Sequence, residues 1–523
     1  MVYQPTISDI CRENGRSYPT REAVVDGSTR FTWRQFDRRV DRVAHVLAQC
    51  GVSRGDRILW LAQGSFRFLE LLTAAGRLGA MICPVNWRQP AEEMAFVIND
   101  LQPAVVFWQE KEIGDTVALA RELAQLDATW IKHDGTESDG YEARVAAAPA
   151  TPLQDGHVRS DDALLVIYTA ATAERPRGAM LSHRNLISMA LGTGEITGAD
   201  HNSIFLNSGP LFHTANFQLE SLPVYVRGGT NVYTPRVDAA NILEILSNEK
   251  VTSAFLMPPT IAEIKKLNSE AGQDISALRA GAFGPMWGSA LPVDPSPWGQ
   301  RPGGYGQTEL TGMALVRAIG PEGTGSAGRP FPGTQVKIVD PAGEEVPDGE
   351  LGEIAIRGDV VHLGYWNRPE VNAARFLDGG WWRTTDAGRR EPDGSVSFLG
   401  TMVRVIKSAA ENIYPPEVEG CLNTHHAVAK SAVIGVPDPV FMQSVKAIVV
   451  LKEGQTVSED ELREYCRKRI ASYKKPKFIE FVQEIPTVGG VIDYDALDAA
   501  FGGGGYPGET DITQARADER AAC

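Results

Sequence analysis

The sequence has little cysteine, no excess of basic charge and no long apolar run, and each shortage excludes a class of protein. Its six cysteines lack C-x-x-C spacing, so neither a disulfide framework nor a zinc site is expected. The formal net charge of -15 argues against a general nucleic-acid binder. Arg67, Glu70 and Arg77 interrupt the most apolar early stretch, so no membrane span is predicted. No signal peptide is recognisable at the start, which makes a cytoplasmic protein the simplest interpretation.

The chain does have the length and the alternation of a multidomain α/β protein. Its 523 residues exceed what one hydrophobic core usually supports, so at least two domains are expected. Residues 31–51 carry apolar side chains at helical spacing and end on Gly51. Short apolar strands at 56–62, 80–86 and 104–108 alternate with helix-like segments. This alternation predicts an α/β fold with mostly parallel sheets.

Two later regions change character. Residues 333–399 hold the strand-like runs TQVKIVD, GEIAIRG and SVSFLG between turn-forming segments, which predicts a β subdomain closing a large domain of residues 1–399. Residues 400–500 mix strand-like runs with a helix whose expected N-cap is Ser458, which predicts a small α+β domain. Residues 501–523 are glycine-rich and then polar, and are predicted to be a flexible tail.

The segment 168–185, YTAATAERPRGAMLSHRN, is the first to suggest chemistry. It follows an apolar strand and precedes a helix-like run, and a strand–loop–helix of this kind can present backbone N–H groups to phosphate. Thr169 and Thr172 supply hydroxyls there, and Arg177 supplies positive charge. Taken alone the match is weak, and an ordinary surface loop explains the segment better.

Further segments appear in a fixed order along the chain. They are PVNWRQ (84–89), GPLFHTANF (209–217), GPMW (284–287), GGYGQTELTG (303–312), GELGEIAIRG (349–358), WWRTTDAG (381–388) and ENIYPPEVE (411–419). Together with the loop they resemble the superfamily of acyl-CoA synthetases, peptide-synthetase adenylation domains and firefly luciferase, from about residue 8 to 500. The Tyr–Gly–x–Thr–Glu order is the most specific of these matches. The resemblance implies a large domain, a small mobile domain, the ligands ATP, Mg²⁺ and CoA, and a small carboxylic acid as substrate.

The resemblance assigns the nucleoside to a first group of residues. Tyr305, followed by Gly306, is expected to stack on adenine, with Gly284 and Pro285 in the adenine-binding segment. Asp386 is placed to accept hydrogen bonds from both ribose hydroxyls, a role that suits a carboxylate.

A second group is assigned to the phosphates and the reacting carboxylate. Thr308 is expected to contact the α-phosphate or the acyl carboxylate, and Glu309 to ligate Mg²⁺ between phosphate oxygens. Thr169, Thr172 and Arg177 are the cofactor-binding candidates of the loop.

The acid is assigned to a third group. His213 is expected beside the acyl pocket. Apolar residues near 213–217 and 282–287, including Trp287, are expected to line a pocket for an apolar or aromatic acid.

The sequence departs from the family pattern around the phosphates. Thr401 stands where an arginine is usual, Val403 stands at the usual hinge position, and Val491 stands where a lysine is usual. Glu174 places a negative charge in the phosphate loop, where it is unfavourable. Loss of one preorganised cation slows such a reaction by about 10²–10³-fold. Lys407, close to the altered hinge, is the candidate that could compensate.

The sequence therefore predicts an ATP-dependent acid–CoA ligase that forms an acyl-adenylate and then a thioester. Two alternatives keep the fold. One is an adenylate-forming enzyme with another nucleophile, such as nitrite. The other is a nucleotide- or acyl-binding protein without turnover. The oligomeric state is open, with a homodimer as one option.

Overall fold

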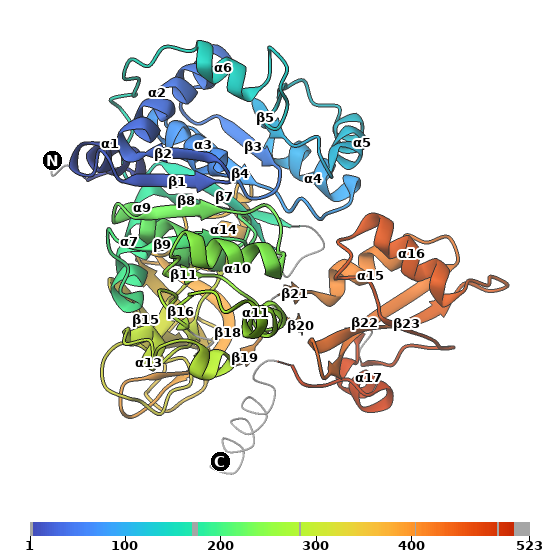
Figure 1. Ribbon diagram of the computed structural model, residues 1–523. Coiled ribbons are helices and arrows are strands. Elements are labelled where there is room, and N and C mark those ends of the chain that lie inside the picture. Colours follow the sequence, from blue (N-terminus) through green and yellow to red (C-terminus); the bar gives the residue numbers. More distant parts are fainter. Residues whose placement is uncertain are drawn as a thin grey trace.

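The structure is a computed structural model that describes residues 4–169, 176–281, 284–402, 404–409, 411–488 and 491–506. Figure 1 shows a large body of α/β layers in blue to yellow and a smaller orange-red lobe beside it. The predicted fold class, a large α/β domain with a β subdomain and a small α+β domain, is confirmed.

A six-stranded sheet forms one layer of the large domain, in the order β6-β5-β3-β4-β7-β8. All neighbours in it are parallel except β7 and β8. The strands are β3 (Arg57–Leu61), β4 (Met81–Pro84), β5 (Val105–Trp108), β6 (Thr129–Lys132), β7 (Ala163–Thr169) and β8 (Arg177–Ser182). The expectation of mostly parallel strands holds for this sheet.

Helices cover both faces of this sheet because successive strand residues point to opposite sides. Ile58 and Trp60 of β3 pack in the cluster that includes α2 and α3, whereas Leu59 and Leu61 pack against α4 and α5 on the other face. The helices of this region are α1 (Ile7–Ser17), α2 (Trp33–Gln49), α3 (Phe66–Leu78), α4 (Ala91–Leu101), α5 (Gly114–Ala124) and α6 (Tyr141–Ala147). Both faces being buried explains the nearly continuous apolar runs of these strands.

The predicted strand–loop–helix around residue 170 is wrong in one respect. The chain returns as β8, antiparallel to β7, before α7 (His183–Thr197) begins. Ser182 caps α7, since its side chain accepts a hydrogen bond from the Asn185 N–H and Asn185 reciprocates. A whole strand therefore separates the loop from the helix N-terminus. Residues 170–175, which include Thr172, Ala171 and Glu174, lie outside the described residues.

A second sheet, in the order β11-β9-β10-β1-β2, forms another layer of the large domain. It is parallel except for the hairpin of β1 and β2. Its strands are β1 (Glu22–Asp26), β2 (Thr29–Thr32), β9 (Ile204–Asn207), β10 (Thr230–Tyr233) and β11 (Ser253–Ala254). The helical segments that accompany it are α8 (Thr214–Asn216), η1 (Phe217–Ser221), α9 (Leu222–Val226), α10 (Ala239–Asn248) and α11 (Pro258–Ala271).

Antiparallel strands close the large domain, as the turn-rich sequence predicted. A five-stranded sheet follows the path β15-β16-β18-β17 with β19 paired to β18, and the short strands β12, β13 and β14 form a second, three-stranded sheet. The strands are β12 (Gly304–Tyr305), β13 (Leu315–Val316), β14 (Arg329–Pro330), β15 (Thr334–Val339), β16 (Gly352–Gly358), β17 (Phe376–Leu377), β18 (Trp381–Arg390) and β19 (Val396–Thr401). The short helices here are α12 (Gly284–Trp287), η3 (Gly288–Ala290), α13 (Pro297–Gln300), η4 (Thr308–Leu310) and α14 (Pro369–Arg375).

The small domain packs helices on a sheet whose strands run in the antiparallel order β21-β20-β23-β22, with β24 parallel to β23 at its side. Ser458 caps α16 through the Glu461 N–H, as predicted. The strands are β20 (Ile406–Ser408), β21 (Glu411–Ile413), β22 (Val428–Asp438), β23 (Met442–Leu451), β24 (Phe478–Phe481), β25 (Thr487–Val488) and β26 (Val491–Ile492). The helices are α15 (Pro415–Asn423), α16 (Glu459–Arg469) and α17 (Tyr494–Phe501).

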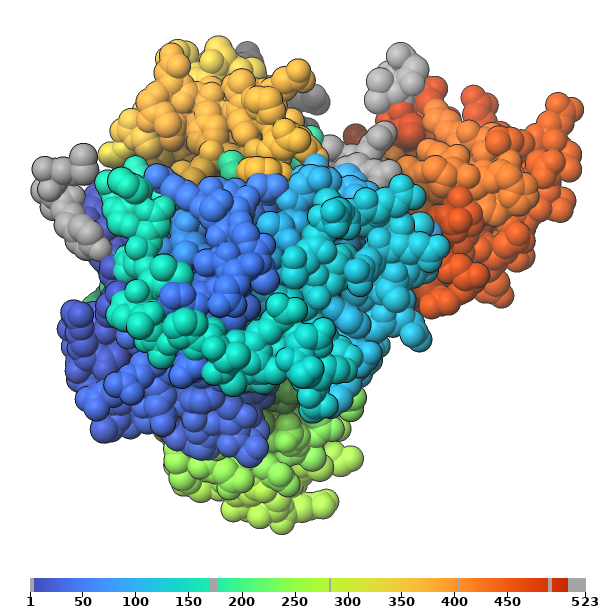
Figure 2. All heavy atoms as spheres, turned by 90° about the horizontal axis from the view of Figure 1, so that it is seen from above, coloured from blue at the N-terminus to red at the C-terminus, as the bar shows by residue number. Residues whose placement is uncertain are grey.

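Charged groups join the two domains. The Lys474 ammonium, in a side chain that is 2% exposed, lies 2.5 Å from Glu417 of the small domain and 3.5 Å from Glu93 of the large domain. Glu93 also accepts a hydrogen bond from the Ala471 N–H at 3.1 Å. A more exposed pair of Arg88 and Glu411 crosses the same junction at 3.1 Å. Figure 2 shows the small domain standing beside the large one as a separate lobe.

Two expectations about chemistry and environment can be compared with the fold. The five cysteines of the described residues form no disulfide. Among the described helices, none combines the length and apolarity needed to cross a bilayer.

Candidate active site

Two adjoining cavities lie at the junction of the two domains. Their volumes are about 250 Å³ and about 410 Å³. Both are lined by Thr169, Gly306, Gln307, Thr308, Lys407 and Asn412, so they form one continuous site, named here the junction site. His213 lines the first cavity, and Tyr305, Glu309 and Asp386 line the second. The structure thus brings together eight of the residues predicted from the sequence.

The turn before Thr308 depends on a glycine. A Cβ atom at Gly306 would lie 1.6 Å from the carbonyl oxygen of Gly312, so a side chain cannot be accommodated there. This close approach positions η4, which carries Thr308 and Glu309, at the wall of the junction site.

Asp386 and Tyr305 are held together in the second cavity. The Tyr305 hydroxyl donates to Asp386 Oδ2 at 2.7 Å, and the Gln307 amide donates to the same oxygen at 2.6 Å. The Tyr305 ring stacks on Phe398 with 5.5 Å between centroids. Burial raises the pKa of Asp386 to about 6, although the two hydrogen bonds act to lower it. Within the described residues, no donor reaches the second oxygen, Oδ1, of this carboxylate.

Glu309 lies beside two arginines. Its Oε1 accepts a hydrogen bond from the Tyr365 hydroxyl at 2.5 Å, and the Arg177 guanidinium lies 5.7 Å from the centre of the Tyr365 ring. Burial lowers the pKa of Arg177, and Arg375 lowers it further by charge repulsion. In the part of the chain that the structure describes, neither arginine forms an ion pair with a carboxylate.

Arg375 is a site residue that the sequence prediction missed. It lines the second cavity, stacks over Trp382 at 5.1 Å, and donates to the Thr385 hydroxyl at 3.3 Å. Thr385 has a φ of 61°, which is unfavourable for a β-branched residue. The Thr385 hydroxyl in turn donates to the Thr384 carbonyl at 2.6 Å. The sequence held one signal for this part of the site. Thr385 is a threonine at a position whose left-handed backbone favours glycine.

The hairpin of β20 and β21 brings Lys407 from the small domain into the junction site. The Lys407 ammonium donates to Asn412 Oδ1 at 2.8 Å, and its backbone N–H donates to Gln443 at 2.8 Å. Burial lowers the pKa of Lys407, and Glu411 opposes that effect. Val403, the expected hinge residue before this hairpin, lies outside the described residues.

His213 lines the first cavity as a neutral ring. Its Nδ1 accepts a hydrogen bond from the Ala215 N–H at 3.2 Å, and burial lowers its pKa, assisted by the charges of Lys407 and Arg88. In this tautomer the proton sits on Nε2, so the ring can donate a hydrogen bond from that atom.

Some predicted residues lie elsewhere. Gly284 and Pro285 open helix α12 and are not among the residues lining the junction site, while Ala282 and Phe283 before them fall outside the described residues. Their adenine contacts stay a prediction. Trp287 was expected to line the acid pocket, but it is 3% exposed and packs in the core formed by α10 and α11.

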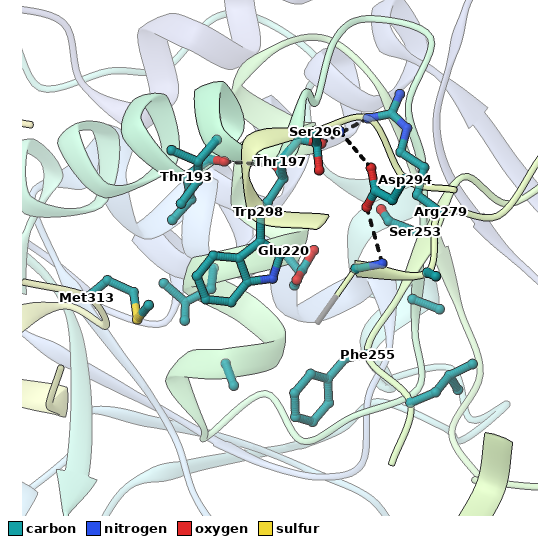
Figure 3. A pocket seen from close by; sticks show the side chains of 17 residues that line it. Thr193, Thr197, Glu220, Ser253, Phe255, Arg279, Asp294, Ser296, Trp298 and Met313 are labelled. Atoms are coloured by element: carbon teal, nitrogen blue, oxygen red, sulfur yellow. Dashed lines mark hydrogen bonds between the residues drawn. The ribbon is translucent and has the colours of Figure 1, made fainter. Parts of the chain in front are cut away.

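A third cavity, of about 220 Å³, adjoins the junction site and is named here the inner cavity. Ala215 lines it directly after Thr214, and Met313 directly after Gly312, whereas Thr214 and Gly312 line the junction site. Phe217, also expected at the acid pocket, is fully buried against Phe68 instead. Figure 3 shows the walls of the inner cavity, with Phe255, Trp298 and Met313 around the hollow.

The fold and the site define a class of two-domain proteins with a buried carboxylate, Asp386, in a cavity at the domain junction. The AMP-binding enzyme family profile matches residues 11–366, and the profile of the AMP-binding enzyme C-terminal domain matches residues 417–489. The chain therefore belongs to the AMP-binding enzyme family, within the adenylate-forming superfamily.

Individual relatives cover nearly the whole chain. A feruloyl-CoA synthase of an Amycolatopsis species is 35% identical over 91% of this chain and 94% of its own length. An indoleacetate–CoA ligase of Aromatoleum aromaticum is 30% identical over 90% of this chain and 92% of its own length. Among solved structures, a double mutant of the o-succinylbenzoate CoA synthetase from Bacillus subtilis aligns with a TM-score of 0.77, 24% identity, and coverage of 95% and 98% of the two chains. That similarity supports the fold alone.

The pKa of Asp386 leads to a test with adenosine, which has no group that titrates near neutral pH. Because the pKa is raised to about 6, Asp386 is mostly ionised at pH 7 and mostly protonated at pH 5. Only the ionised form accepts hydrogen bonds through both oxygens, so adenosine affinity is expected to fall about tenfold from pH 7 to pH 5. Calorimetric titration measures this ratio. Asp386→Asn should bind weakly and without pH dependence, and equal wild-type affinity at both pH values would contradict the assignment.

The left-handed conformation of Thr385 leads to a prediction with opposite effects on stability and activity. Thr385→Gly removes a backbone strain of about 1–3 kcal/mol, against a flexibility cost of about 0.5–1 kcal/mol, so unfolding in urea should require about 1 kcal/mol more free energy. The same change removes the hydroxyl that holds Arg375 and should slow turnover. Thr385→Ala is the matched control, because it loses the hydroxyl but keeps the strain. Equal stability of the glycine and alanine variants would argue against strain.

Proposed function

We propose that this protein is an ATP-dependent acid–CoA ligase that works at the junction site. The proposal rests on three features that lie in adjoining cavities. A carboxylate suited to a nucleoside, Asp386, lines the second cavity of the junction site together with Glu309, Arg375 and Lys407, and the first cavity of that site adjoins the mostly apolar inner cavity. A nucleotide and an organic acid can therefore meet at the shared wall, next to Thr308.

Asp386 and Tyr305 are proposed to bind the nucleoside. Oδ1 of Asp386, which no donor of the described residues reaches, accepts from one ribose hydroxyl, and Oδ2 accepts from the other once the Tyr305 or Gln307 donor yields to it. The Tyr305 ring and the turn at Gly306 form the wall on which adenine stacks.

Glu309 is the residue that fits a magnesium ion. One of its oxygens is occupied by Tyr365, and in the described part of the structure the other has no donor, so it is available to a hard cation. No group of three or more acidic, histidine or cysteine side chains clusters among the described residues, so phosphate oxygens and water would complete the coordination. A bound Mg²⁺ would supply charge neutralisation for the phosphates.

Three cations are proposed to face the phosphates and the charge that develops on them. Arg375 lines the second cavity on the large-domain side, Arg177 lies near Glu309 without lining either cavity, and Lys407 enters from the small domain. We propose that they supply positive charge in place of the family's usual arginine, at Thr401, and its usual lysine, at Val491. Fixed charges of this kind act without reorganising during the reaction, which makes them effective in stabilising a transition state.

The proposed reaction has two steps. In the first, a carboxylate oxygen of the acid attacks the α-phosphorus of ATP, and the bond to pyrophosphate breaks. In the second, the CoA thiol loses its proton to solvent, its sulfur attacks the acyl carbon, and the bond to AMP breaks. The neutral ring of His213 can donate from Nε2 to an acid oxygen and hold the carboxylate in line.

Product analysis tests the proposal. The protein, ATP, Mg²⁺ and a panel of aryl and short aliphatic acids should yield pyrophosphate with at least one acid, and AMP with an acyl-CoA once CoA is added. Pyrophosphate release with nitrite and an arylamine, but with no acid, would point to the alternative nucleophile. Nucleotide binding without any release would identify a binding protein and overturn the ligase assignment.

A further inference from the structure

A single unpaired carboxyl group lies on the wall of the inner cavity. Glu220 sits in η1, a π-helical turn between α8 and α9, and such turns are frequent at functional sites. In the part of the chain that the structure describes, no hydrogen bond or ion pair reaches its side chain. Figure 3 shows Glu220 beside the indole of Trp298, pointing into the hollow. A carboxyl group placed in apolar surroundings without a partner is unfavourable unless a ligand supplies one.

The other charged groups of the inner cavity are already satisfied. The Arg279 guanidinium donates to the carbonyl oxygens of Thr197 at 2.9 Å and Gly198 at 2.7 Å. Asp294 accepts from the Ser296 N–H at 2.9 Å and from the Gly281 N–H at 3.2 Å. Burial raises the pKa of Glu220 to about 7, and the negative charge of Asp294 adds to the effect. Among the described residues, therefore, no group uses the acceptor capacity of Glu220.

The size of the cavity limits the ligand. A dry cavity of about 150 Å³ is sufficient for benzene. The inner cavity, at about 220 Å³, has room for one aromatic ring with a small substituent and a short connection to the carboxylate. The side chains of Phe255, Trp298 and Met313 offer aromatic and sulfur contacts to such a ring.

We infer that Glu220 selects acids with a single aromatic ring that carry an uncharged hydrogen-bond donor, a hydroxyl or an aromatic amine, at the end opposite the carboxylate. This inference rests on the proposed function, because it places the acid's carboxylate at the junction site and its ring in the inner cavity. The connection passes between Ala215 and Met313, whose neighbours Thr214 and Gly312 line the junction site. Glu220 is then a specificity-determining residue and does not touch the reacting atoms.

Matched acids test the inference. Benzoic and cinnamic acids are compared with their 4-hydroxy, 4-amino and 4-methoxy derivatives, because the methoxy group fills space but cannot donate. In at least one series, at a pH of about 8.5, where a carboxyl group with a pKa of about 7 is ionised, the hydroxy or amino acid should bind at least about tenfold more tightly than the methoxy acid, as expected for a hydrogen bond to a charged acceptor. Comparison of the hydroxy acid with the amino acid then shows whether the site prefers a hydroxyl group or an aromatic amine. Calorimetry measures binding directly, and acyl-CoA formation gives the same ratio as kcat/KM.

Three variants complete the test. Glu220→Leu should lose the preference for a donor, and Glu220→Gln, which keeps one acceptor oxygen, should retain part of it. Met313→Leu, on another wall of the cavity, should shift the affinity for all members of a series alike. Circular dichroism and thermal unfolding show whether each variant is folded.

The outcomes separate this inference from the proposed ligase function. Absence of pyrophosphate release with every acid would overturn the ligase function, while the binding ratios would still report on Glu220. Turnover without discrimination between hydroxy and methoxy acids, tighter binding of the methoxy acid, or an unchanged preference in Glu220→Leu would each overturn the inference. So would failure of all the acids to bind.

Discussion

Replacing Arg375 by methionine is expected to slow acyl-adenylate formation by about 100-fold. Arg375 lines the junction site, and no carboxylate of the described residues neutralises it, so its charge is free to act on the phosphates. Removal of one preorganised group that stabilises developing charge costs about 10²–10³-fold in rate. Pyrophosphate release in a single turnover, at saturating ATP and acid, measures the step itself.

The controls for Arg375 separate charge from packing. Arg375→Lys keeps the charge and should recover part of the rate, although the planar stacking on Trp382 is lost. Arg357→Met is matched, because Arg357 stacks on the neighbouring Trp381 at 4.6 Å but does not line the junction site, and it should react at the wild-type rate. Adenosine affinity should not change in either methionine variant. A rate for Arg375→Met within about twofold of wild type would show that Arg375 does not act on the reaction.

Lys407→Met is expected to have a similarly large effect, again about 100-fold on acyl-adenylate formation. Lys407 is the cation that the small domain brings to the wall shared by both cavities of the junction site. Its position depends on the hairpin, since its ammonium is held by Asn412 and its backbone by Gln443. The measurement is again single-turnover pyrophosphate release, followed by thioester formation from preformed acyl-adenylate.

Two further variants define what Lys407 contributes. Lys446→Met removes another lysine of the same domain, one that donates to the Phe501 carbonyl and lies outside the junction site, so it should leave both steps unchanged. Lys407→Arg keeps the charge and should retain more activity than the methionine variant. If Lys407→Met slowed only thioester formation, the lysine would serve the second step, and the proposed compensation for the residue at Val491 would be wrong.

The general architecture could be predicted because the spacing of apolar residues along the chain indicates which side chains are buried. Strand β3 reads as a continuous apolar run since Ile58 and Leu59 face helices on opposite sides of the sheet. The misreading near residue 170 has a physical cause as well. Strand β8 is short and mostly buried, and α7 begins directly after it at His183, so the apolar run of the strand merges with the helical pattern.

The candidate site could be predicted where the chemistry depends on a local motif, and not where it depends on packing. Thr308, Glu309 and Asp386 stand in short segments of characteristic order, and the fold brings them to one cavity. Arg375 and Glu220 stand in segments without such an order. The sequence also does not show which way a side chain points. Trp287 was therefore predicted at the acid pocket although it packs in the core.

The two charged contacts at the domain junction differ in how much water surrounds them. Arg88 and Glu411 are partly exposed, so dissolved ions screen their attraction, whereas Lys474 is enclosed between Glu93 and Glu417 and is screened much less. A rise in ionic strength consequently weakens the outer contact and leaves the inner one almost unaffected. We therefore expect added salt to loosen the hairpin that carries Glu411 and Lys407 from the large domain before it loosens the contact at Lys474.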